Sequence, residues 1–182
     1  MKILEEKKID CLGTNIVLCS GLALVAIFSA VTMAVAEITE VNSFVELQEA
    51  IVNEKTKIAV KNAINFTADG PLIDYSDIVI SGPSENAPGL LDGKDKYKFF
   101  MFGENTKNIS LKNLHLKNGS IGDRDDYIAG GSAIQLGARL VISLEGLTFS
   151  NNQTRSRGGA IYSWGTDGSN RNSLNFTGKT IF

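Results

Sequence analysis

The sequence has 182 residues, of which 43% are hydrophobic and 21% are charged, and its formal net charge is −2. This is an ordinary globular composition, and the near-neutral charge excludes the basic footprint typical of nucleic-acid-binding proteins. Glycine is frequent at 18 residues and proline is rare at 3, which favours turn-rich β structure over helical bundles. His115 is the single histidine, which excludes a zinc site made of several histidines and weakens any histidine-based triad.

The N-terminal 36 residues predict an export signal. Residues 1–14 are polar and of mixed charge, whereas residues 15–36 are almost wholly apolar or small and end in Ala34-Val35-Ala36. An A-x-A site after an apolar stretch is typical of a cleaved signal peptide, although about 20 apolar residues could also span a bilayer as an uncleaved anchor. We expect cleavage before Glu37. Cys11 and Cys19 would leave with the signal, so the mature chain would hold no disulfide and no thiolate metal site.

A short amphipathic helix is predicted over residues 43–53. Ser43 and Glu46 form an S-x-x-E capping box, and apolar residues follow at helical spacing, namely Phe44, Leu47, Ala50 and Ile51. The first coil of a solenoid has an exposed apolar end, so we interpret residues 37–56 as an N-terminal cap containing this helix. A partner-binding helix is the alternative.

From Lys57 onward the hydrophobic period changes to two, which predicts an all-β fold over residues 57–182. The apolar runs are short, and Gly, Asn, Asp and Ser supply the turns between them. The principal runs cover residues 58–66, 72–80, 90–91, 96–102, 109–116, 140–149, 159–164 and 174–182. Because Asn118-Gly119 is the one Asn-Gly dipeptide, and a strand of matching pattern does not follow it at once, stacked parallel coils are favoured over a hairpin sandwich.

Two of these runs repeat. Residues 109–119 align with residues 142–152 at an offset of 33, while the glycine-led runs recur at an offset of 28, from Gly131 to Gly159. Unequal offsets between similar short strands predict a solenoid whose loops vary in length. Equivalent positions would then stack, with Leu and Phe in interior columns and Asn118 and Asn151 in a side-chain amide ladder at a turn.

Phe149-Ser150-Asn151-Asn152, followed by Gly158-Gly159-Ala160-Ile161, resembles the paired F-x-x-N and G-G-A-I motifs of polymorphic outer-membrane proteins and related autotransporter or adhesin passengers. Residues 116–119 and 130–134 match more loosely, with Leu for Phe and an inserted Ser132. The resemblance implies a right-handed parallel β-helix that is exported to the cell surface or outer membrane. The copies are few, and the C-terminal barrel of an autotransporter is missing, so we interpret the chain as a β-helix truncated at its C-terminus.

Several side chains are candidates for chemistry. Asp123, Asp125 and Asp126, with Arg124 among them, form an acidic cluster that could bind calcium or act as acid and base, although a solvated turn is the simpler interpretation. For each of the other candidates, a structural or surface role is the preferred interpretation. Arg155 and Arg157 could alternatively bind an acidic ligand, and Tyr162 and Trp164 could stack on sugars. The remaining candidates are the aromatic run Tyr97–Phe102, the outward-facing His115, and five N-x-S/T sequons at Asn65, Asn108, Asn118, Asn152 and Asn175.

The sequence therefore assigns no catalytic residue, no cofactor and no metal ligand, and it favours a non-catalytic role in adhesion or surface display. The expected partner is a host or cell-surface protein or glycan, with no nucleic acid, and with membrane contact only through the signal or a missing barrel. Two alternatives remain open. One is a carbohydrate-active β-helix enzyme, a polysaccharide lyase or hydrolase, and the other is an inert truncated product.

Overall fold

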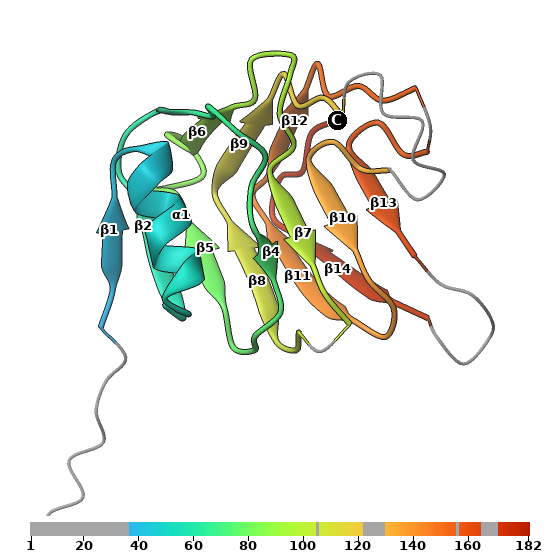
Figure 1. Ribbon diagram of the computed structural model, residues 1–182, viewed down its shortest axis with the longest axis horizontal. Coiled ribbons are helices and arrows are strands. Elements are labelled where there is room, and N and C mark those ends of the chain that lie inside the picture. Colours follow the sequence, from blue (N-terminus) through green and yellow to red (C-terminus); the bar gives the residue numbers. More distant parts are fainter. Residues whose placement is uncertain (1–36, 105, 122–129, 156, 165–170) are drawn as a thin grey trace, which may run out of the picture. The chain divides into compact units, whose positions relative to one another are not determined.

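The computed structural model describes residues 37–104, 106–121, 130–155, 157–164 and 171–182, all within the unit Val35–Phe182 (Figure 1). The predicted signal peptide, residues 1–36, and the acidic cluster Asp123, Asp125 and Asp126 lie outside the described residues. Across the described ranges, no helix combines the length and the apolar character needed to cross a membrane.

The described chain consists of short strands and one helix, and every strand pair is parallel. In chain order the elements are β1 (Thr39–Val41), α1 (Phe44–Val52), β2 (Lys57–Val60), β3 (Ile64–Asn65), β4 (Leu72–Ile73), β5 (Val79–Ser81), β6 (Gly89–Asp92), β7 (Phe100–Phe102), β8 (Ile109–Lys112), β9 (Leu114–Lys117), β10 (Ile134–Leu136), β11 (Val141–Glu145), β12 (Thr148–Ser150), β13 (Ile161–Ser163) and β14 (Ser173–Thr177).

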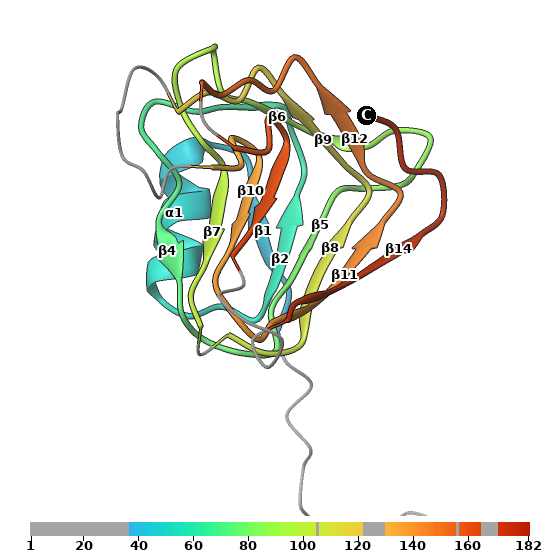
Figure 2. The same cartoon turned by 90° about the vertical axis from the view of Figure 1, so that its right-hand side faces the viewer.

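The strands form three sheets that wind into a solenoid. Sheet A has the order β1-β2-β5-β8-β11-β14, sheet B has β12-β9-β6-β3 and sheet C has β13-β10-β7-β4. The chain runs through one strand of A, one of B and one of C, and then returns to A beside the strand from which it started. Figure 2 shows the three sheets as three walls around a common interior. The predicted parallel β-helix is confirmed.

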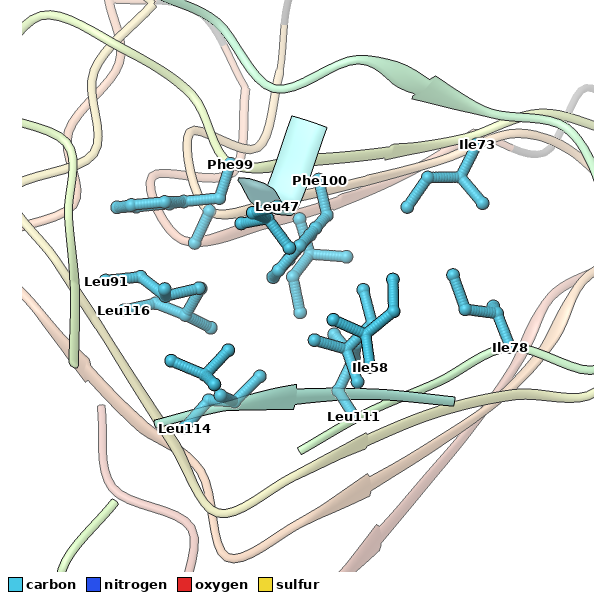
Figure 3. Close-up of a cluster of buried hydrophobic side chains, with 14 of the residues drawn as sticks. Leu47, Ile58, Ile73, Ile78, Leu91, Phe99, Phe100, Leu111, Leu114 and Leu116 are labelled. Carbon is cyan, nitrogen blue, oxygen red and sulfur yellow. The ribbon is translucent and has the colours of Figure 1, made fainter. Parts of the chain in front are cut away.

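The interior is made by side chains that alternate along each strand. In β8, Ile109 and Leu111 are buried whereas Ser110 and Lys112 are partly exposed. Ile109 pairs with Ile142, and Leu111 with Leu144, so the predicted interior columns and their offset of 33 residues are confirmed. Figure 3 shows such side chains converging from α1 and from strands of all three sheets. Complete burial of one such side chain stabilises the folded state by about 1.5–3 kcal/mol relative to leaving it exposed to water.

Two of the predicted alternating runs each contain a corner. The run 109–116 is divided into β8 and β9 by Asn113, and the run 140–149 into β11 and β12 by Gly146 together with Leu147. Asn113 and Gly146 have φ angles of 52° and 59°, in the left-handed region that turns the chain sharply. At each corner the chain passes from sheet A to sheet B. Hydrophobic alternation alone did not predict these corners.

The predicted helix is confirmed as α1, with Ser43 as its N-cap. The Ser43 hydroxyl accepts a hydrogen bond from the backbone N–H of Glu46, and the Glu46 carboxylate accepts one from the backbone N–H of Asn42 at 2.6 Å. The buried face of α1 joins the core of the solenoid, where the ring of Phe44 lies 4.7 Å from that of Phe66. The helix therefore covers the apolar end of the first coil.

The aromatic run Tyr97–Phe102 is part of the core, as predicted. Phe99, Phe100 and Phe102 are buried, and Tyr97 packs against them while partly exposed. The rings of Phe99 and Phe66 meet edge to face at 4.8 Å. Together with the contact between Phe66 and Phe44, this aromatic chain links the capping helix to the second full coil.

The predicted offset of 28 between the glycine-led runs was wrong by one residue. Ile134 pairs with Ile161, and the backbone N–H of Gly131 donates to the carbonyl of Gly158, so the offset is 27. Ser132 is therefore no insertion but takes the place of Gly159. Its small hydroxyl is accommodated there because it donates a hydrogen bond to the carbonyl of Gly159 in the next coil.

Candidate functional site

The corner between sheets B and C carries the amide ladder that the sequence predicts. Asn118 and Asn151 both have left-handed backbones, with φ angles of 56° and 52°. The Asn151 side chain donates to the Asn118 side-chain oxygen at 3.3 Å, and the Asn118 side chain donates to the Asp92 carboxylate at 3.1 Å. The chain of side-chain hydrogen bonds thus extends one coil further than the sequence analysis reached, to Asp92, which pairs in register with Lys117 and lies one position before the ladder.

Asp92 is a buried carboxylate, and its charge is held by hydrogen bonds. Burial alone would raise its pKa, but the backbone N–H of Lys94, the Asn118 amide and the Lys94 ammonium together lower it below the usual 3.8. The ammonium lies 3.2 Å from the carboxylate. This arrangement gives Asp92 a structural role in the turn that follows β6.

Asn152, the last residue of the F-x-x-N motif, ties two coils together. Its side-chain oxygen accepts from the backbone N–H of Gly119 at 2.8 Å, and its side-chain nitrogen donates to the carbonyl of Leu116 at 2.8 Å. Phe149, the first residue of the motif, is buried and pairs with Leu116. The motif therefore supplies one interior side chain and one amide that satisfies the backbone of the preceding turn.

The G-G-A-I motif makes the turn into sheet C. Gly158 and its equivalent Gly131 have φ angles of 58° and 69°. A Cβ atom at either position would lie 2.1 Å from a carbonyl oxygen, that of Ile161 or of Ile134. Only glycine therefore suits these two positions, and Ala160 and Ile161 then turn toward the core.

His115 lies on the outer face of sheet B, as predicted, and is half-buried there. Its Nε2 atom is 2.7 Å from the Ser150 hydroxyl of the adjacent coil. The pKa of the imidazole is lowered, and partial burial is the largest cause. The neighbouring charge of Lys117 lowers the pKa further, while the charge of Asp92 raises it. These effects favour the neutral imidazole, which forms a side-chain link between two coils.

The outer face of sheet C holds the aromatic residues singled out in the sequence. Tyr162 pairs in register with Gln135, Gln135 with Met101, and Met101 with Leu72, which is 58% exposed. The rings of Tyr162 and Trp164 meet edge to face at 6.3 Å, and both are partly exposed. The structure brings these side chains into one uncharged row, hereafter the sheet C row (Leu72, Met101, Gln135, Tyr162 and Trp164). Sequence reasoning did not identify this row, because the residues that form it come from four different coils.

The remaining candidates are dispersed. Arg155 and Arg157 are exposed in the loop between β12 and β13. Among the sequon asparagines, Asn108, Asn118 and Asn152 have amides that donate hydrogen bonds within the protein. Asn65 and Asn175 are exposed, and the Asn175 amide oxygen accepts a hydrogen bond from the Ser173 hydroxyl at 3.4 Å. Within the described part of the chain, no group of three or more His, Cys, Asp or Glu side chains could hold a metal ion.

Comparison with known proteins identifies one segment. Residues 146–163 match the family model of the Chlamydia polymorphic membrane protein repeat. No curated protein and no solved structure matches the chain. The matched residues run from the corner at Gly146 through β12 and the Asn152 contacts to β13, so the two motifs described above both fall within them. Residues 146–163 of this parallel β-solenoid are therefore similar to the repeat of the polymorphic membrane proteins.

Proposed function

We propose that this chain is a surface-exposed β-solenoid passenger that acts in adhesion or surface display. The observation that carries the proposal is the match of residues 146–163 to the polymorphic membrane protein repeat. The fold supports it, because each coil hydrogen-bonds to its neighbours through three sheets and presents its alternate side chains outward. Such a scaffold offers broad, rigid lateral faces for contact with a partner.

The sheet C row is the lateral face best suited to a partner at a cell surface. It combines two partly exposed aromatic rings with the amide of Gln135 and the exposed side chain of Leu72. Aromatic side chains give large contact areas at low entropic cost, and they are enriched at interfaces. The partner is a host or cell-surface protein or glycan.

A bead assay tests the proposal. Beads coated with the purified chain are expected to attach to cultured host cells, and Tyr162→Ala/Trp164→Ala is expected to lose most of that attachment. Val45→Ala/Val52→Ala is the matched control, because these residues are 58% and 66% exposed on α1. Pretreating the cells with a protease or with glycosidases then identifies the class of partner. Attachment no better than that of albumin-coated beads would contradict an adhesive role.

The proposal also holds that the chain does not cleave polysaccharides. Uronic-acid polymers incubated with the purified chain are expected to keep their length, as measured by the absence of new reducing ends and of unsaturated products. Steady release of either product by the chain, and none by a heat-denatured sample, would establish the carbohydrate-active alternative instead.

Export completes the proposal, with residues 1–36 as a signal peptide that is removed before Glu37. The support is the apolar stretch 15–36 and its Ala34-Val35-Ala36 ending. Material recovered from the cell surface is expected to give an N-terminal sequence that begins at Glu37. A sequence that begins at Met1 would show that the segment is retained.

A further inference from the structure

We propose that a hollow on the outer face of sheet A binds a small carboxylate that carries one apolar group of about the size of a benzene ring. This inference stands apart from the adhesive role, because that role was assigned to the sheet C row. The hollow has a volume of about 180 Å³ and lies over β2 and β5, beside the start of β1. Its lining residues are Ile38, Lys57, Ile58, Ala59, Val79 and Ser81.

The hollow exists because two small side chains follow one another on successive coils. The outward-facing residues of β2 and β5 are Lys57 and Ala59, and Val79 and Ser81. Ala59 pairs in register with Ser81, so this column of the outer face stays low. Lys57 pairs with Val79, and these longer side chains form a wall beside the low column.

The position of the hollow inside the sheet shows how a ligand would be recognised. β2 pairs with β1 and β5, and β5 pairs with β2 and β8, so both strands are inner strands of sheet A. Their backbone groups are already used in the sheet, and an extended peptide therefore cannot add to them as a further strand. Recognition rests on the side chains that line the hollow, which suits a small ligand.

The walls of the hollow are mostly apolar. Ile38 directly precedes β1 and is 61% exposed, and Ala59 and Val79 add further aliphatic surface. A lysine also lays its aliphatic stem along apolar surface while its ammonium stays in water, as the half-buried Lys57 does here. A cavity of roughly 150 Å³ with apolar walls binds benzene, so the hollow has room for one group of that size.

The charge beside the hollow favours an anion. Two ion pairs flank it on the same sheet, Glu40 with Lys61 at 3.0 Å and Lys112 with Glu145 at 2.8 Å. Lys57, by contrast, forms no ion pair with any residue that the structure describes. Its ammonium can donate a charge-assisted hydrogen bond to a ligand carboxylate. One ammonium balances the single charge of a carboxylate, whereas a phosphate monoester would bring about two.

A chemical-shift titration of the isotope-labelled full-length chain tests the proposal. The probe is phenylpropionate, which joins one phenyl ring to one carboxylate. The backbone amide signals of residues 57–59 and 79–81 are expected to shift and to saturate, while those of β11 stay in place. Phenylpropanamide, the neutral analogue of the same shape, is expected to bind about fivefold more weakly, as the loss of a partly exposed ion pair implies.

Two variants separate the ionic from the apolar contribution. Lys57→Gln is expected to weaken the binding of phenylpropionate about fivefold and to leave the binding of the amide unchanged. Lys112→Gln is the matched control, because the Lys112 ammonium lies on the same sheet and already pairs with Glu145. Ala59→Leu is expected to fill the hollow and abolish the binding of both probes. Its control is Ser143→Leu, which adds the same side chain to the outer face at β11.

The proposal is overturned if no saturable shifts appear at residues 57–59 and 79–81, or if Ala59→Leu binds phenylpropionate as the parent does. It is also overturned if the amide binds as tightly as the acid. That last result would identify the hollow as a seat for a neutral apolar side chain of a partner protein.

Discussion

At the scale of single residues, the repeat motifs act by satisfying the backbone of a neighbouring coil. Asn152 hydrogen-bonds both to the N–H of Gly119 and to the carbonyl of Leu116, at positions where the chain turns out of sheet B. A buried backbone group without a partner is destabilising, so the Asn152 amide stabilises this turn. The motif therefore acts structurally, by joining its coil to the preceding one.

Asn152→Ala is expected to lower the free energy of unfolding by about 1–3 kcal/mol, because two backbone groups lose their partner. Asn151→Gly is the matched control, because glycine accepts the φ of 52° without strain and the exposed Asn151 side chain donates one hydrogen bond at 3.3 Å. Urea unfolding followed by circular dichroism measures both. Equal losses for the two variants would contradict the role assigned to Asn152.

His115 makes stability depend on pH. Its pKa is lowered in the folded protein from the ordinary value of 6.5, so the unfolded chain binds the proton more readily. The stabilisation is therefore present above pH 6.5 and is lost as the pH falls through the lowered pKa. Thermal unfolding across this range is expected to show a decline that His115→Gln reduces. An undiminished decline in His115→Gln would assign the effect to other groups.

At the scale of elements, corners decide the register of the coils. The turn into sheet C depends on Gly158, whose φ of 58° and contact with the Ile161 carbonyl leave no room for a side chain. The same geometry at Gly131 holds the equivalent corner of the preceding coil. Strands of three residues, such as β10 and β13, contribute few hydrogen bonds each, so the corners that align them matter greatly.

Gly158→Ala is expected to destabilise the solenoid by at least about 1–2 kcal/mol, the usual cost of a left-handed backbone for a residue with a Cβ. Gly159→Ala is the control, because its φ is not in the left-handed region and a Cβ would come no closer than 3.0 Å to a neighbouring atom, the Asn152 carbonyl oxygen. Chemical denaturation of the two variants separates them. A Gly158→Ala protein as stable as the parent would show that the turn is differently built.

The elements also show how far sequence reasoning reached. The columns of Leu111 with Leu144 and of Leu116 with Phe149 were predictable, because the same offset of 33 residues relates the paired residues of both strand pairs. The glycine-led turn was misaligned, because Ser132 replaces a glycine and its compensating hydrogen bond is not visible in a sequence. Asp92 was missed for a similar reason, since its coil has a different spacing and its carboxylate performs the task of an amide.

At the scale of the whole molecule, function follows from surfaces that the winding brings together. The sheet C row draws its side chains from β4, β7, β10 and β13 and from the residue after β13, so no sequence motif contains it. The repeat, by contrast, is local and was recognisable within residues 146–163. A sequence can therefore indicate the scaffold more readily than the face that contacts a partner.

The central claim is that parallel coils stack in register around one interior. Cross-strand nuclear Overhauser contacts in isotope-labelled protein test it most directly, because parallel and antiparallel pairs give different patterns of proton distances. The account predicts parallel contacts between Ile109–Leu111 and Ile142–Leu144, and again between Ile142–Leu144 and Leu174–Phe176. Antiparallel contacts within these pairs, or their displacement by one residue, would contradict it.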